Sequence, residues 1–268
     1  MTSVHVPPSH PRAASIRVRE RLIGRYRSGV VACAGLIAHG RGEAFDYLLG
    51  EETTNPALKA MEAAAATLLT AKRPVISING NVAALVAKDV VRLSKAADTR
   101  IEVNLFYRSI ERERAIRDLL TKAGAREVLG VARSASGRIP ELGSERRHVD
   151  RHGILVADVV LVPLEDGDRT EALVKMGKKV IAVDLNPLSR TAQQASITIV
   201  DNITRAMPKL TEAVKELKRK DPDECREILR VFDNKRNLGK SIQLINQRLA
   251  KLAQEGKSLI LEDKKADL

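Results

Sequence analysis

Two hydrophobic patterns divide the chain near residue 74. Before that point apolar residues recur at helical spacing, which predicts three helices. The first is expected over residues 9–29, with Ser9 as its N-cap and Pro11 in its first turn. The second includes residues 44–49, and the third covers residues 56–72. Residues 1–72 are therefore expected to form an N-terminal helical part.

From residue 74 onward, apolar runs alternate with amphipathic stretches. The runs predict strands at 74–80, 100–106, 126–131, 154–164, 179–185 and 196–203. Helices are expected at 82–97, 109–124, 168–178 and 188–195, and a long polar loop without periodicity at 132–153. Strands that alternate with helices are typical of parallel βαβ units.

Only helical patterns follow the last predicted strand, over residues 204–220, 223–233 and 234–257. The fold class is therefore predicted as α/β, with a Rossmann-like, mostly parallel sheet of about six strands. We expect one domain over residues 1–268, made of the N-terminal helices, a core at 74–203 and C-terminal helices at 204–268.

Composition narrows the partners that this fold is expected to bind. The net charge of +12 is compatible with an anionic ligand, a nucleic acid or a charged surface, but only 2% of the residues are aromatic and no zinc-finger spacing occurs. Cys33 and Cys225 have no CxxC partner, which favours a reducing cytoplasm. No apolar segment approaches membrane-spanning length. We expect a cytoplasmic protein that binds neither nucleic acid nor membrane.

Polar residues cluster where four of the predicted strands end. These turns are Asn79-Gly80-Asn81, residues 165–170, residues 184–191, and Asp201-Asn202. Helix capping alone explains any one such turn, but parallel strands end at one edge of a sheet, where ligands bind. Four polar turns at one edge favour a binding site. The substrate-binding candidates are His10, Asn79, Asn81 and Arg169.

The turn EDGDRT, residues 165–170, has three carboxylates beside an arginine. One of them is explained as a helix cap, but a cluster this dense also suits Mg²⁺ or an ammonium group. Asp166 and Asp168 are the candidate metal ligands and are also candidate catalytic residues.

The stretch HGRGE, residues 39–43, has two interpretations that the sequence leaves equally open. In one, Gly40 and Gly42 let the backbone approach a ligand while Arg41 donates to phosphate oxygens. In the other, the stretch is a kinked helix with a solvent-facing arginine. There is no Walker motif and no GxGxxG after the first strand. His39 and Arg41 are candidate catalytic residues, whereas Glu43 has no assigned role.

Taken together, several motifs resemble the archaeal 4-phosphopantoate:β-alanine ligases, also called phosphopantothenate synthetases. The resemblance covers nearly the whole chain, in SHPR (9–12), AGLIAHGRGEAFDYLLGE (34–51), NGNVAALV (79–86), EVNLFYR (102–108), ADVVLVPLEDGDRTEALVKMGK (157–178), DLNPLSRTA (184–192) and ITIVDNI (197–203).

This resemblance implies a homodimeric ligase of coenzyme A biosynthesis. Such an enzyme joins 4-phosphopantoate and β-alanine to 4′-phosphopantothenate through an acyl adenylate, and converts ATP, with Mg²⁺, to AMP and diphosphate. By resemblance the ATP contacts fall on Arg19, Arg41, Asp184, Leu185, Asn186, Arg190, Thr191, Asn202 and Ile203. The residues that bind the pantoate phosphate and the β-alanine amine are not implied. We hypothesise that loop 132–153 closes over the adenylate.

Two alternative functions are kept at this point. One is an NAD(P)-dependent Rossmann-type oxidoreductase, which the missing glycine fingerprint disfavours. The other is a basic, non-enzymatic nucleic-acid-binding protein, which the positive charge alone supports.

Overall fold

Five parallel strands form the central sheet of the computed structural model, which describes residues 6–7, 9–10, 12–131, 137–140 and 142–255. Their order across the sheet is β2-β1-β5-β6-β7. The strands are β1 (Pro74–Ile78), β2 (Arg100–Val103), β5 (Val159–Pro163), β6 (Lys179–Val183) and β7 (Ile197–Ile199). The α/β fold class with a parallel sheet is thus confirmed, with five strands in this sheet rather than six.

The strand order places a switch point in the middle of the sheet. The chain runs outward from β1 to β2, and then crosses back to build β5, β6 and β7 on the other side of β1. Connections therefore leave β1 and β5 in opposite directions. A crevice opens at the carboxyl ends of two such strands, and it is the usual ligand site of doubly wound sheets.

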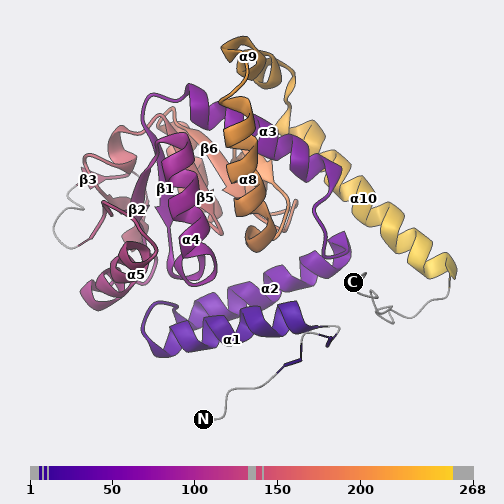
Figure 1. Cartoon of the computed structure of the whole chain (residues 1–268), viewed down its shortest axis with the longest axis horizontal. Helices are drawn as coiled ribbons and strands as arrows, with labels where there is room; N and C mark the ends of the chain where they lie inside the picture. Colours follow the sequence, from indigo (N-terminus) through magenta and orange to yellow (C-terminus); the bar gives the residue numbers. More distant parts are fainter. Residues whose placement is uncertain (1–5, 8, 11, 132–136, 141, 256–268) are drawn as a thin grey trace.

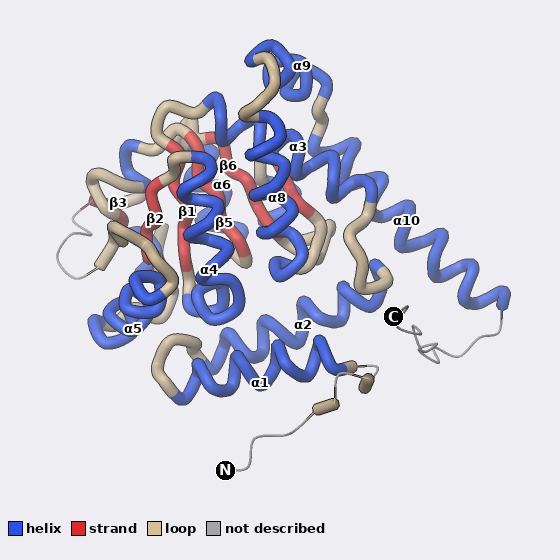
Figure 2. Tube along the Cα trace, viewed as in Figure 1, coloured by secondary structure: helices blue, strands red, loops and turns tan. Residues whose placement is uncertain are grey.

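Helices cover both faces of the sheet, because successive side chains of a strand point to opposite faces. On one face, Ile76 and the strand residues that point the same way pack against four helices. These are α3 (Asn55–Thr70), α4 (Gly80–Ala97), α5 (Ile110–Lys122) and α8 (Ile203–Leu217). Val75 and its equivalents pack against the other layer, which includes α6 (Gly167–Lys175). Figure 2 shows α4 and α8 in front of the strands.

The N-terminal helices form a separate layer. α1 (Ala13–Arg27) and α2 (Cys33–Leu49) lie side by side below the sheet in Figure 1. A side chain at position 35 of α2 would collide with Asn81, since an added Cβ would lie 2.3 Å from its Oδ1, so Gly35 allows α2 to approach the start of α4. α2 therefore lies close to the carboxyl edge of the sheet.

The remaining helices complete the C-terminal part. α7 (Arg190–Gln194) connects β6 and β7, while α9 (Pro222–Val231) and α10 (Asn234–Glu255) both pack against α3. α10 also contacts α2, and its C-terminal end extends beyond the rest of the protein at the right of Figure 1. No helix in the described ranges is both long and apolar enough to cross a membrane.

The predicted strand 126–131 is wrong. In this segment only Leu129 pairs with the sheet edge, through a single parallel bridge to Glu102. Gly130 then takes a φ of +75°, which ends the extended conformation. The predicted strand 154–164 starts late, at Val159, because residues 154–156 form a 3₁₀ turn.

Two helix starts also differ from the prediction. α1 begins at Ala13 with Arg12 as N-cap, so Ser9 is not the cap, and Pro11 lies outside the described residues. α2 runs without interruption from Cys33 through HGRGE to Leu49, so neither a glycine turn nor a kink occurs there. Two glycines cost a helix roughly 2 kcal/mol relative to alanine, which tertiary packing overrides here.

The predicted loop 132–153 has local structure where it is described. A two-stranded ribbon pairs β3 (Gly137–Arg138) with β4 (His148–Val149), and a 3₁₀ turn covers Glu145–Arg147. Residues 132–136 and 141 of this loop lie outside the described residues, as does the predicted tail helix beyond Glu255. We call residues 137–149 the ribbon segment.

Candidate active site

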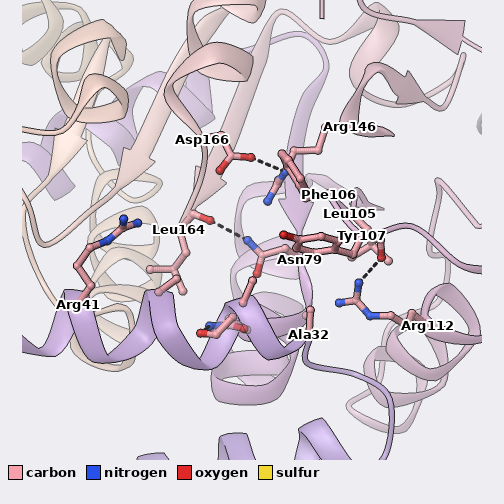
Figure 3. Close-up of a pocket in the computed structure, with 15 residues that line it drawn as sticks. Ala32, Arg41, Asn79, Leu105, Phe106, Tyr107, Arg112, Arg146, Leu164 and Asp166 are labelled. Carbon is pink, nitrogen blue, oxygen red and sulfur yellow. Dashed lines mark hydrogen bonds and ion pairs between the residues drawn. The ribbon is translucent and has the colours of Figure 1, made fainter. Parts of the chain in front are cut away.

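A cavity of about 280 Å³ lies at the switch point, between the carboxyl ends of β1 and β5 (Figure 3). Its walls come from α2, the ends of β1, β2 and β5, α5 and the ribbon segment. The charged side chains that line it are Arg41, Arg112, Arg146 and Asp166. Three guanidinium groups around one carboxylate make this cavity electropositive and suited to an anion.

Arg112 of α5 is a half-buried cation of the cavity without a carboxylate partner among the described residues. Its guanidinium donates to the backbone carbonyls of Tyr107 and Val30, the latter at 3.2 Å, and it makes no ion pair with any described residue. Burial and the positive charge of Arg146 both lower the pKa of Arg112. An anion bound between these two arginines would relieve their repulsion.

Arg146, from the ribbon segment, is held by two carboxylates. Its Nη1 lies 2.6 Å from Glu165 Oε1, and its Nε lies 2.8 Å from Asp166 Oδ2 (Figure 3). Glu165 also pairs with Arg169, which is fully buried and donates to Ser77 Oγ at 3.1 Å. A chain of buried charges thus connects β1 to the cavity wall and fixes the Arg146 guanidinium.

Backbone contacts hold the ribbon segment from the other side. The buried Asn104, directly after β2, donates to the carbonyls of Arg146 and His148 at 3.1 and 3.0 Å. Arg108 donates to the carbonyls of His148 and Gly130 and pairs with Glu113 at 2.5 Å. The end of β2 therefore places the loop that delivers Arg146.

Asn79 ties the two strands of the switch point together. Its Oδ1 accepts from the Val82 backbone N–H and caps α4, while its Nδ2 donates to the Leu164 carbonyl at 2.8 Å. Leu164 has a φ of +55°, a left-handed conformation that non-glycine residues rarely adopt. Such strain clusters at functional sites, where the surrounding structure maintains it.

The substrate-binding candidates are therefore divided. Asn79 and Asn81 line the cavity, but Asn81 also donates to the Gly35 carbonyl at 2.8 Å. Arg169 lies beneath the cavity wall and is not exposed. His10 precedes α1 and does not line the cavity.

Arg41 stands at the opposite end of the cavity from Arg112, on α2 (Figure 3). It is exposed and makes no ion pair with the described residues. Its charge acts on Asp184, at the end of β6: burial raises the pKa of Asp184, and Arg41 and the hydrogen bonds from Ser189 and Asn186 partly offset this. Arg41 thus borders both the cavity and the ends of β6 and β7.

The residues predicted to contact ATP gather along this second half of the edge. Asp184 accepts from the Asn186 backbone N–H at 2.9 Å, and Leu185 packs in a small cluster with Val200. Asn202 caps α8, in which Ile203 is the first residue. The turns that follow β6 and β7 are therefore adjacent, because these two strands are parallel neighbours in the sheet.

Arg190 and Thr191, after β6, contact the turn that follows β5 and so connect the nucleotide side of the carboxyl edge to the cavity side. Arg190 pairs with Asp168 at 2.5 Å and with Glu171 at 2.9 Å, so the EDGD and SRT turns touch. The buried Thr191 donates to the Glu165 carbonyl at 2.9 Å.

Arg19, on α1, faces α2 rather than the cavity lining. Its charge acts on His39 and Glu43, and its buried Nε has no hydrogen-bond partner among the described residues. Burial lowers the pKa of His39, while Glu43 opposes this shift. Glu43 accepts from Ser15 and Tyr47, so it connects α1 and α2.

The described residues do not support a protein-held metal site. None of their His, Cys, Asp and Glu side chains form a group of three or more that could hold a metal ion. Asp166 and Asp168, the predicted ligands, each pair with an arginine instead. The dense carboxylates of EDGD are thus matched by Arg146, Arg169 and Arg190.

The sequence interpretation missed Arg112 and Arg146 as cavity residues. Arg112 lies in the amphipathic pattern of a predicted helix, where an arginine normally indicates a solvated face. Arg146 lies in a loop whose path is set by distant carboxylates. Only the resemblance, through EVNLFYR, and the arginine content of loop 132–153 pointed to this region.

Comparisons with known proteins identify relatives over almost the full length. The family model described as phosphopantothenate/pantothenate synthetase matches residues 56–248. A 4-phosphopantoate–β-alanine ligase of Thermococcus kodakarensis is 54% identical over 254 residues, which are 94% of this chain and 97% of that protein. Proteins of the same name from Thermococcus onnurineus and Methanosarcina mazei are 53% and 49% identical, over 94% and 93% of this chain and 97% and 98% of theirs.

Proposed function

The chain belongs to the phosphopantothenate/pantothenate synthetase family, and from this premise we propose that it ligates 4-phosphopantoate and β-alanine in coenzyme A biosynthesis. The enzyme is a 4-phosphopantoate–β-alanine ligase that uses ATP. Neither an oxidoreductase nor a nucleic-acid-binding protein occurs among the relatives reported above.

One observation supports the position that we propose for 4-phosphopantoate. Arg112 faces the cavity without a carboxylate partner among the described residues, beside Arg146. We assign the phosphate of 4-phosphopantoate to these two guanidinium groups, because arginine forks match phosphate oxygens. The apolar side chains of Leu105 and Leu164 line the same cavity and suit the dimethyl carbon of pantoate. The substrate carboxylate then extends toward Arg41.

The nucleotide occupies the ends of β6 and β7 in this proposal. Its contacts are those implied by the family: Arg19, Arg41, Asp184, Leu185, Asn186, Arg190, Thr191, Asn202 and Ile203. The support is that most of these residues lie along one half of the carboxyl edge, next to the cavity. Arg41 borders both halves, which supports its assignment to the point where the acid and the α-phosphate meet.

The chemistry has two steps. The pantoate carboxylate attacks the α-phosphorus of ATP, an acyl–phosphate bond forms, and diphosphate leaves with the bonding electrons. The neutral amine of β-alanine then attacks the acyl carbon, AMP leaves, and the nitrogen loses a proton as the amide forms. Arg41 stabilises the charge that develops on the phosphate oxygens in the first step.

Two further groups have roles in the second step. Asp166 is the carboxylate that lines the cavity among the described residues, and burial raises its pKa. We assign it to the β-alanine ammonium. Arg146 of the ribbon segment and residues of α2 line the cavity, and we propose that they limit the access of water, which competes with the amine for the adenylate. We propose that Mg²⁺ enters on the phosphates of ATP, because Glu165, Asp166 and Asp168 of the EDGD turn are each paired with an arginine.

We also propose a homodimer. Large apolar side chains that are exposed on the isolated chain support this, among them Ile37, Tyr107, Ile110 and Leu188. Sedimentation equilibrium at micromolar concentration tests it: twice the chain mass is expected, and a single chain mass contradicts it.

The direct test of the function is product analysis. The protein is incubated with ATP, Mg²⁺, 4-phosphopantoate and β-alanine, and nucleotides are separated. AMP and phosphopantothenate in equal amounts are expected. ADP instead of AMP would indicate an acyl-phosphate mechanism, and an absence of ATP turnover would contradict the ligase assignment.

A further inference from the structure

We propose that Asp46 and Arg205 are positioning residues, which hold α2 against the start of α8 and thereby set the place of Arg41 at the nucleotide. This inference rests on the proposed function, because it assigns the link a role in ATP binding. Neither side chain needs to touch the reacting atoms.

The contacts form a closed network between two distant parts of the chain. Arg205 of α8 donates to both carboxylate oxygens of Asp46, at 3.1 Å from Nη1 and 2.5 Å from Nη2. The same guanidinium donates from Nε to Asp201 Oδ1 at 2.9 Å. The Asp46 and Asp201 side chains are 7% and 0% exposed, so water does little to weaken these charge interactions.

The network includes a predicted nucleotide contact. Asn202 donates from Nδ2 to Asp46 Oδ2 at 2.8 Å, while its Oδ1 accepts from the Thr204 backbone N–H at 3.1 Å and caps α8. Asp201 Oδ2 accepts from Thr53 Oγ1, in the connection between α2 and α3. The Asn202 amide is therefore held at its nitrogen by Asp46 and at its oxygen by the first turn of α8.

α2 has few other polar ties to the body of the protein. Its Glu43 contacts α1, and the Gly35 carbonyl accepts from Asn81 near the other end of the helix. Within the described ranges, no ion pair besides Asp46–Arg205 joins α2 to the sheet or to its covering helices. Figure 1 shows α2 in the layer below the sheet, so the ion pair adds to the Gly35 contact and the Leu49 cluster in holding α2 near the carboxyl edge.

The link lies close to the residue that it positions. Arg41 and Asp46 are on the same helix, five residues apart, and a helix rises about 1.5 Å per residue, so roughly 7.5 Å separates them along the axis. A helix transmits displacement over this distance as a rigid body. Loss of the Asp46 charge would remove the polar tie at this end of α2 and leave it to the apolar cluster of Leu49 and Leu185, so the part of α2 that carries Arg41 could shift relative to Asp184.

The test measures ATP affinity and its dependence on both residues. Asp46→Asn keeps the size of the side chain and removes its charge, and Arg41→Ala removes the group that the link is proposed to position. The dissociation constant of ATP is measured by calorimetry without the other substrates, for the wild type, both single variants and the double variant. Glu212→Gln, which breaks an exposed ion pair on the same α8, is the control.

Asp46→Asn is expected to weaken ATP binding roughly tenfold in the wild-type background, the loss expected of one charged contact. In the Arg41→Ala background it should weaken binding only about two- to threefold, because Arg41 is gone and only the Asn202 contact still depends on Asp46. Asp46→Glu, which keeps the charge, should recover part of the affinity, and Glu212→Gln should leave it unchanged.

Two results would overturn the proposal. One is a folded Asp46→Asn variant that binds ATP as the wild type does, and the other is a full tenfold loss in both backgrounds, which would show a purely structural role. If Asp46→Asn does not fold, Arg205→Lys replaces it in the same cycle. Formation of AMP by the wild type is scored separately, so a failed function and a failed link are distinguishable.

Discussion

The two halves of the carboxyl edge balance their charges differently. At the ends of β6 and β7 the buried charges are satisfied: Arg205 lies between Asp46 and Asp201, and Asp184 accepts hydrogen bonds within its own turn. The exposed Arg41 at the border of this half makes no ion pair with the described residues. At the ends of β1 and β2, Arg112 faces the cavity, and its partners among the described residues are backbone carbonyls. We refer to these as the matched half and the unmatched half.

The difference distinguishes two uses of charge. A buried ion pair that is satisfied by its neighbours fixes geometry and contributes little binding energy to a ligand. A guanidinium held near a second one and without a carboxylate is ready to receive an anion. In the function that we propose, the matched half shapes the nucleotide site, and the unmatched half supplies the charge that selects a phosphorylated acid.

The largest expected effect is that of Arg112→Met. Removing a charged contact to phosphate costs roughly 2–3 kcal/mol, so the KM for 4-phosphopantoate should rise about 30- to 150-fold while the KM for ATP changes little. Steady-state kinetics with each substrate varied in turn measures this. Arg117→Met, an exposed arginine of the same helix, is the control. An equal rise in both KM values would abolish the distinction between the halves.

A smaller effect is expected for Arg41→Ala, at the border. Turnover should fall at least about tenfold without a change in the fold, because a charged contact to phosphate oxygens is lost. The turnover number is measured at saturating substrate concentrations and the fold by circular dichroism. Arg92→Ala, on the exposed side of α4, is the control. Activity at the wild-type level would remove Arg41 from the site.

Glu165→Gln should affect stability more than catalysis. The change leaves the fully buried Arg169 without its carboxylate partner, which typically costs 3–5 kcal/mol, about the penalty of an uncompensated buried charge. Urea unfolding measures it. Activity should fall less than in the two arginine variants, because Arg146 keeps its pair with Asp166. An unchanged free energy of unfolding would show that the chain of buried charges does not stabilise the unmatched half.

Glu102→Gln is expected to have the least effect on activity, and its signature is pH dependence. Glu102 is buried and accepts from the backbone N–H groups of Asp150 and Ile154, which hold the loop after the ribbon segment. Burial raises its pKa from 4.5 to about 7. Between these values the folded state holds a proton that the unfolded state has lost.

The stability that this protonated carboxyl contributes is therefore fully present below about pH 4.5 and is lost as the pH rises to about 7. The wild type should lose roughly 3 kcal/mol relative to Glu102→Gln over this range. Thermal or urea unfolding of both proteins at several pH values measures the difference. A constant difference from pH 4.5 to 8 would contradict the raised pKa.

Much of the sheet was predictable because its strands are buried on both faces. Their apolar runs stand out between amphipathic helices, and β1, β2, β5, β6 and β7 all lie within predicted strands. The strand at 126–131 was a false prediction, since the pattern REVLGV is apolar enough for a strand but Gly130 turns the backbone away. The local sequence does not show whether an apolar segment pairs along the edge strand of the sheet or only touches it at one residue, as Leu129 does.

The site was predictable only in part, for a related reason. The polar turns after β1, β5, β6 and β7 were recognisable because parallel strands end together. Arg112 and Arg146 were not recognisable as site residues, because their role depends on which nearby carboxylates form ion pairs, and this is visible only in the folded structure. For HGRGE the sequence left a glycine approach to a ligand and a kinked helix equally open. The structure has a helix with an exposed Arg41 but no kink, and Gly35 rather than Gly40 is in close contact.

The most direct test of the two-half site is isotope exchange between diphosphate and ATP. The assay contains the wild-type protein, ATP, Mg²⁺ and labelled diphosphate, with each organic substrate added separately. Label should enter ATP when 4-phosphopantoate is present, without β-alanine, and Arg112→Met should require far more of the acid for the same exchange rate. Exchange that needs β-alanine, or that proceeds equally well with unphosphorylated pantoate, would contradict an adenylating site whose unmatched half binds the phosphate.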